Sequence, residues 1–123
     1  MDLFTFTHVC IDAKRVNNEA LLTSAVSVIA FASRVASLFG FEMPDADKIM
    51  KHQAVRPDRA GGIITCFPFN NGSFLLLVRT FPSYGSVQID CMGHGVDRVG
   101  LFDVVRSFYE TDIVFLNMVR RAL

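Results

Sequence analysis

The feature that most constrains the fold is a pair of apolar runs separated by a short turn. The runs GIITCFPF (62–69) and SFLLLVRTF (73–81) flank Asn70, Asn71 and Gly72. An Asn-Gly pair between two apolar segments favours the left-handed backbone of a tight hairpin turn. The two runs are therefore predicted to be neighbouring antiparallel strands, and any fold for this chain must contain that hairpin.

The second strand of this hairpin sets a further condition. Residues 74–78 are apolar at every position, without the alternation of a strand that has one face in water. Both faces of that strand are therefore expected to be covered. Helices of the same chain can cover one face, and a second copy, stacked sheet to sheet in a symmetric homodimer, would cover the other.

Periodicity places the remaining elements. We expect strands at 3–11, 86–92 and 112–116, and a loop with a short strand at 41–61. One helix is expected from Asn17 or Asn18 to Phe39 and a second from Asp97 through Phe108. The basic tail at 119–123 is expected to be frayed or docked on the second helix. On the first strand Phe4, Phe6, His8 and Cys10 share a face. This order predicts a single domain, residues 1–123, of the α+β class: a two-layer sandwich of an antiparallel sheet with two helices on one face.

Composition excludes some classes of function. Lys+Arg and Asp+Glu number 12 each, so no charge field indicates binding to nucleic acid or to an anionic membrane. Apolar residues make up 51% of the chain, which for a small domain favours a buried subunit interface. The apolar segment 21–41 contains Arg34 and several Ser and Thr, and is predicted to be an amphipathic core helix rather than a membrane span.

The number and spacing of the cysteines predict that their thiols are reduced. Cys10, Cys66 and Cys91 are odd in number and form no C-x-x-C pair, and the chain opens without a charged segment and cleavage site, so we expect a cytoplasmic location. Together with His8 and His94 they offer metal-ligand atoms, but their spacing is loose. We therefore predict no metal, and buried cysteines that serve as small apolar residues.

The segment RTFPSYGSVQIDCMGHG (79–95) resembles the signature of the small prokaryotic S-adenosylmethionine decarboxylases, which read S-E-S-H-[IL]-S-I-H-T-W-P-E-x-G-Y-A-A-I-D-x-F-T-C-G. The letters that match are Thr80, Pro82, Gly85, Ile89, Asp90 and Gly95, with Phe81 in place of the Trp. The order of elements on both sides agrees as well. The resemblance implies the fold of that family and a connection to polyamine metabolism.

The family chemistry starts from a serine that becomes an N-terminal pyruvoyl group when the chain cleaves itself, and this carbonyl is the electron sink for decarboxylation. The resemblance places that serine at Phe74, the histidine that assists processing at Arg79, the ribose-holding carboxylate at Ser83 and the proton-donating cysteine at His94. A guanidinium cannot act as a base near neutral pH. The scaffold letters are thus present, and the reactive groups are replaced.

The first interpretation is a catalytically degenerate, decarboxylase-like homodimer without a cofactor. It would act by binding a small molecule, or a protein such as an active decarboxylase subunit. The resemblance implies a ligand site formed by Phe4, Phe6, Arg79, Ser83 and His94. All of these except Ser83 also have a structural interpretation: the phenylalanines as core, His94 as a loop residue between turn glycines, and Arg79 as the partner of an acidic residue, Asp90, across the hairpin.

The second interpretation is a self-processed pyruvoyl enzyme. A one-residue bulge in the hairpin would make Ser73 the pyruvoyl precursor at a Gly72–Ser73 bond, with His94 or Cys91 as proton donor and S-adenosylmethionine or a basic amino acid as substrate. A one-residue slip, however, turns every later side chain to the opposite face. The third interpretation is a structural or interaction module whose resemblance is only topological.

Overall fold

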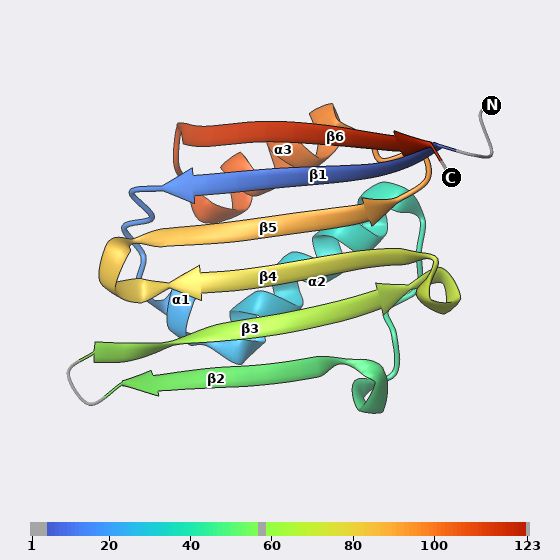
Figure 1. The fold of residues 1–123 in the computed structure, drawn as a ribbon. Helices are drawn as coiled ribbons and strands as arrows, with labels where there is room; N and C mark the ends of the chain where they lie inside the picture. The colour runs from blue at the N-terminus through green and yellow to red at the C-terminus, as the bar shows by residue number, and fades with distance from the viewer. Residues whose placement is uncertain (1–4, 57–58, 123) are drawn as a thin grey trace.

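The structure is a computed structural model that describes residues 5–56 and 59–122, and the side chains of 6–51 and 62–119. Within these residues, six antiparallel strands form one sheet in the order β2-β3-β4-β5-β1-β6. Figure 1 shows the sheet in front and the helices together behind it. The predicted α+β sandwich with an antiparallel sheet and helices on one face is confirmed.

The elements follow the predicted order with longer strands. The strands are β1 (Thr5–Lys14), β2 (Met50–Arg56), β3 (Arg59–Phe69), β4 (Phe74–Phe81), β5 (Ser86–Gly93) and β6 (Ile113–Ala122). The helices are α1 (Ala20–Thr23), α2 (Ala25–Phe39) and α3 (Arg98–Tyr109), and short 3-10 turns occupy η1 (Ala46–Lys48), η2 (Asn70–Gly72) and η3 (Pro82–Tyr84). No helix of the described residues is long and apolar enough to cross a membrane.

The predicted hairpin joins β3 to β4. Asn70, Asn71 and Gly72 have φ of 52°, 57° and 84°, the left-handed backbone that the Asn-Gly signal indicates. Pairing then runs without interruption from Phe69↔Phe74 to Ile64↔Arg79. The bulge that would shift the register at this hairpin is therefore absent from the paired residues. A register shift occurs instead between β2 and β3, at Ala54/Arg56.

The first helical segment departs from the sequence prediction. The single helix expected from Asn17 or Asn18 to Phe39 is two helices, because Ser24 is extended at φ −99° and its hydroxyl accepts a hydrogen bond from Ser27 N at 3.4 Å. A serine side chain competes with the helix backbone in this way and starts a new helix. The predicted cap of α3 is confirmed, since Asp97 accepts from Gly100 N at 2.9 Å.

The C-terminal segment also differs. The basic tail expected to be frayed or docked on a helix continues β6 instead, and its backbone pairs with β1 as far as Thr5↔Ala122. An isolated β1 edge would leave a row of N–H and C=O groups without partners, and the longer β6 pairs with them. The strand predicted at 112–116 therefore covers the whole length of β1, which becomes an interior strand.

Strand alternation gives the sheet two different faces. The helix side is a closed core in which Phe31, Phe67, Leu76, Val78 and Leu101 are all 0% exposed. We call the opposite side the open face, because no helix of the described residues covers it. Its side chains are Phe6, His8, Cys10 and Asp12 of β1, Ile64, Cys66 and Pro68 of β3, Leu75, Leu77, Arg79 and Phe81 of β4, Gln88, Asp90 and Met92 of β5, and Phe115, Asn117 and Val119 of β6.

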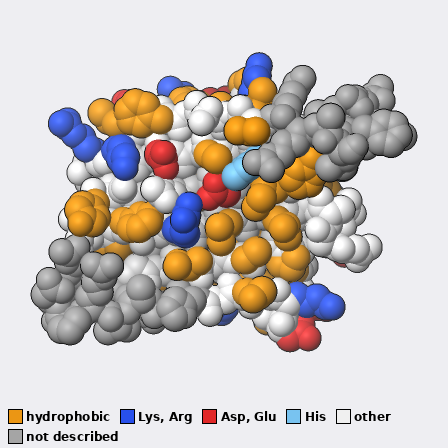
Figure 2. Space-filling view, viewed as in Figure 1, with side chains coloured by type: hydrophobic (Ala, Val, Ile, Leu, Met, Phe, Trp, Pro, Cys, Tyr) orange, Lys and Arg blue, Asp and Glu red, His pale blue; other side chains and the backbone are white. Residues whose placement is uncertain are grey.

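Figure 2 looks onto the open face and shows a few charged side chains and a histidine surrounded by hydrophobic side chains. Met50, which is opposite Cys66 and so also on this face, Ile64 and Phe115 are exposed, and Leu75 and Leu77 are half-buried. The prediction that both faces of β4 are covered thus holds within one chain for the helix side only.

We predict that Leu76→Ala and Leu75→Ala differ strongly, although they are adjacent in β4. Leu76 lies in the helix-side core at 0% exposure, so its truncation is expected to lower the free energy of unfolding by about 2–5 kcal/mol. Leu75 lies on the open face, so Leu75→Ala should lower the free energy of unfolding by less. Urea unfolding at low protein concentration measures both, and equal losses would contradict the assignment of the two faces.

Candidate functional site

Two of the candidate residues lie at the end of the sheet where β4 begins and β5 ends. The Ser73 hydroxyl is exposed and donates a hydrogen bond to the carbonyl of Asn70 at 2.8 Å. The backbone of Ser73 lies beside Gly93, where an added Cβ would stand 3.3 Å from the Ser73 carbonyl oxygen. His94 follows directly and is exposed, and its ring meets the edge of Phe6 with 5.9 Å between centroids. Phe4 lies outside the described residues.

The position that the resemblance assigns to the pyruvoyl serine is part of the core. Phe74 is 2% exposed on the helix side of β4. Its ring centroid lies 4.8 Å from that of Phe39, 5.1 Å from that of Phe41 and 6.4 Å from that of Phe69. Aromatic pairs at these separations stabilise a core through packing and quadrupole interactions. Phe74 therefore packs as a structural residue.

The remaining candidates are not gathered at that end. Cys91 is 0% exposed on the helix side, and burial, with the nearby Asp90 charge, raises the pKa of its thiol far above the ordinary range. Ser83 is exposed in η3, at the other end of β5. The eight residues of β5 separate that end from His94 by about 25 Å. Ser83 and His94 therefore cannot touch the same small ligand within one chain.

A hollow of about 780 Å³ lies beside the β3–β4 turn, between the segment after α2 and η2. Its lining includes Phe41, Glu42, Lys48, Pro68 and Asn71. None of the predicted ligand residues that the structure describes, Phe6, Arg79, Ser83 and His94, contributes to it. The ligand site implied by the resemblance therefore does not coincide with this hollow.

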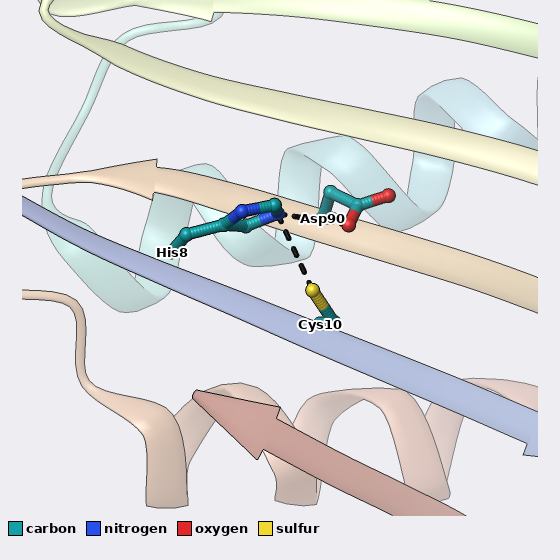
Figure 3. A group of neighbouring side chains, drawn as sticks. All are labelled: His8, Cys10 and Asp90. Atoms are coloured by element: carbon teal, nitrogen blue, oxygen red, sulfur yellow. Dashed lines mark hydrogen bonds and ion pairs between the residues drawn. The ribbon is translucent and has the colours of Figure 1, made fainter. Parts of the chain in front are cut away.

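The open face brings together a polar cluster that the sequence only partly indicates: His8, Cys10, Arg79 and Asp90. Cys10 of β1 is directly opposite Asp90 of β5, and His8 stands two residues earlier on the same face. His8 Nε2 lies 2.9 Å from Asp90 Oδ1 and 3.3 Å from Cys10 Sγ. Figure 3 shows the His8 ring reaching toward both partners.

Arg79 completes the cluster from β4. Its Nη2 donates to Asp90 Oδ2 at 3.3 Å, which confirms the predicted Arg79–Asp90 pair across the hairpin. Asp90 is only 8% exposed. A carboxylate at that depth requires charged or hydrogen-bonding partners, and each of its two oxygens has one. The cluster is thus an ion-paired group in the middle of a face on which most of the other side chains are apolar.

The geometry of the cluster argues against a cysteine nucleophile. Burial, then the hydrogen bond and charge of Asp90, raise the pKa of Cys10 to about 11, so the thiol is protonated at neutral pH. In a nucleophilic triad the carboxylate holds one ring nitrogen and the nucleophile faces the other. Here Asp90 and Cys10 both meet Nε2. The histidine therefore cannot relay a proton between them.

His8 and Cys10 are among the metal ligands that the sequence offers, whereas Asp90 is expected only as a scaffold letter and as the partner of Arg79. Cys66, also included, lies in the same cross-strand row as Asp90, with Leu77 between them. Cys91 points to the opposite side of the sheet. The detectable signal was the His-x-Cys alternation on one face of the first strand. The pairing of β1 with β5 supplies the third group.

Comparisons with known proteins support the fold. No protein-family model matches the sequence. No curated protein matches it either. Among solved structures, the crystal structure of the adenosylmethionine decarboxylase from Aquifex aeolicus VF5 is similar, with a TM-score of 0.74 and 10% sequence identity over 98% of this chain and 92% of that chain. The fold of that decarboxylase, expected from segment 79–95, is thereby established for this chain.

We predict that Asp90→Asn makes Cys10 more reactive. Loss of the carboxylate charge should lower the pKa of Cys10 from about 11 toward the ordinary 9.0, so alkylation by iodoacetamide at mildly alkaline pH should accelerate. Peptide mass spectrometry over time measures the rate. Cys66, whose pKa is raised by burial alone, is the internal control. An unchanged Cys10 rate, or equal acceleration at Cys66, would contradict the prediction.

Proposed function

We propose that this chain is a non-catalytic protein with the S-adenosylmethionine decarboxylase fold, which stays uncleaved and acts by binding a second decarboxylase-fold chain through its open face. The observation that carries the proposal is Phe74, buried at 2% exposure where the resemblance requires the serine that becomes the pyruvoyl group. A phenyl ring has no group that can form an ester or a carbonyl. The electron sink of the reaction cannot arise at this position.

The neighbouring positions support the same conclusion. Arg79 stands where the resemblance places the processing histidine, and its guanidinium is paired with Asp90 at 3.3 Å. The β3–β4 register is uninterrupted, which favours Phe74 rather than Ser73 at the strand position of the pyruvoyl precursor. Its hydroxyl is bonded to the Asn70 carbonyl within the turn. These contacts favour a folded, intact chain over self-cleavage.

The open face supports the binding role. Leu75, Leu77 and Met92 are half-buried, while Ile64 and Phe115 are 39% and 61% exposed, across four neighbouring or nearby strands. Apolar side chains placed in this way around the polar cluster favour sheet-on-sheet packing. We propose a second copy of this chain as its partner, in a symmetric dimer. An active decarboxylase subunit of the same fold is the related partner through which the chain would act in polyamine metabolism.

Intact mass under denaturing conditions tests the loss of processing. We expect one uncleaved species at 13.7 kDa in the wild type and one uncleaved species in Ser73→Ala. We also expect no release of carbon dioxide from S-adenosylmethionine. Two fragments that break at Gly72–Ser73 in the wild type but not in Ser73→Ala would overturn the proposal. They would favour the pyruvoyl enzyme, with His94 at the same end of the sheet as the first residue to examine.

Light scattering after size exclusion tests the interface. We expect the wild type at twice 13.7 kDa and Leu77→Glu at the monomer mass, because the new carboxylate would be buried between the sheets without a partner. Val26→Glu is the matched control, since Val26 is 76% exposed on α2, away from the open face, and its variant should remain dimeric. Circular dichroism confirms that each variant folds. A monomeric wild type, or a dimeric Leu77→Glu, would reject the self-paired interface.

The regulatory role has its own measurement. Adding this chain to a purified, active S-adenosylmethionine decarboxylase of the same fold should change its rate of carbon dioxide release, and Leu77→Glu should abolish the effect. An unchanged rate together with a stable self-dimer would restrict the function to self-association.

A further inference from the structure

We propose that His8, Cys10 and Asp90 form a binding site for a divalent transition-metal ion of the zinc type. This inference goes beyond the proposed function: it rests on three side chains of one chain, which lie on the same open face. Their ligand atoms lie within 4.8 Å of one another. They come from two adjacent interior strands, β1 and β5, so the backbone that carries them is held by pairing on both sides.

The distances suit a tetrahedral ion. Zinc bonds of about 2.0–2.3 Å to nitrogen, oxygen and sulfur place neighbouring ligand atoms roughly 3.3–3.6 Å apart. In the cluster, Nε2 to Oδ1 is 2.9 Å and Nε2 to Sγ is 3.3 Å. The third pair of ligand atoms, Cys10 Sγ and an Asp90 oxygen, lies within 4.8 Å, so insertion of an ion also requires the Cys10 and Asp90 side chains to rotate toward the common point.

The convergence on one nitrogen is the second observation that favours an ion. Nε2 of His8 faces a carboxylate oxygen on one side and a sulfur on the other. Without an ion, protons hold these atoms together, because Nε2–H can donate to Asp90 Oδ1 and the protonated Cys10 thiol donates to Asp90. A cation at the common point satisfies all three atoms at once.

The surrounding charges fit a divalent cation. Asp90 and Asp12 act electrostatically on Cys10, and Arg79 is the opposing positive group. Two carboxylates against one guanidinium leave one net negative charge, and ionisation of the thiol on metal binding adds another. Arg79 holds Oδ2 of Asp90 and leaves Oδ1 turned toward His8, as an outer partner orients a ligand.

The donor set selects the metal. A thiolate and an imidazole favour zinc or cobalt over magnesium and calcium, which prefer oxygen donors. Three protein ligands leave a fourth position for water or another donor. The His8 and Asp90 side chains are 35% and 12% exposed, so this position opens toward the open face.

Titration of the reduced, full-length protein with Co²⁺ tests the proposal. Cobalt bound to a thiolate gives a charge-transfer absorption that oxygen and nitrogen ligands do not give. We expect this band to saturate at one equivalent per chain and to disappear on addition of Zn²⁺. Cys10→Ser should abolish the band. His8→Ala and Asp90→Asn should weaken Co²⁺ binding by more than the roughly 10- to 100-fold that follows loss of an outer partner.

Cys66→Ser is the matched control, since Cys66 is a half-buried thiol of the same face, separated from the cluster by Leu77. It should leave the band and the affinity unchanged. Cys10→Ala, with circular dichroism on every variant, separates loss of the ligand from loss of the fold. Absence of the band in the wild type, its persistence in Cys10→Ser, or its equal loss in Cys66→Ser would overturn the site.

Discussion

The uninterrupted register across β3, β4, β5 and β1 determines which side chains of this molecule can meet. Side chains alternate between faces, so a slip of one residue would exchange the core and the open face along every strand that follows. With the observed register, Phe74 joins the phenylalanine cluster behind the sheet, and Arg79 and Asp90 meet in front of it. The fold, the burial of Phe74 and the polar cluster all depend on this pairing.

Local chemistry predicts much of this fold and little of its site. The Asn71–Gly72 turn and the Asp97 cap each follow from neighbouring residues, and the structure has both. The break at Ser24 was missed because a serine is tolerated inside many helices, and only its cap contact with Ser27 distinguishes this one. The length of β6 was missed because it depends on pairing with β1, about which its own sequence carries no signal.

The polar cluster of His8, Cys10, Arg79 and Asp90 also depends in part on strand pairing that the local sequence does not predict. His8 and Cys10 share a face by simple alternation, so the sequence places them together. Asp90 lies 82 residues from His8 in the chain, and only the order of strands brings it to Cys10. The Arg79–Asp90 pair, within one hairpin, was predictable for the opposite reason. Sequence separation, rather than the type of residue, divides the contacts that were predicted from those that were not.

The position of β1 in the sheet has a consequence for biosynthesis. Among the described strands β1 is the first in the chain, yet its two neighbours, β5 and β6, are the last two. During most of translation, Val9 and Ile11 therefore have neither their sheet partners nor the α3 side of the core to cover them. Strands whose pairing partners are far away in the sequence form their contacts late, and until then their apolar side chains can cause aggregation. His8 and Asp12 alternate with these apolar residues and place polar groups on the other face of β1 while it is unpaired.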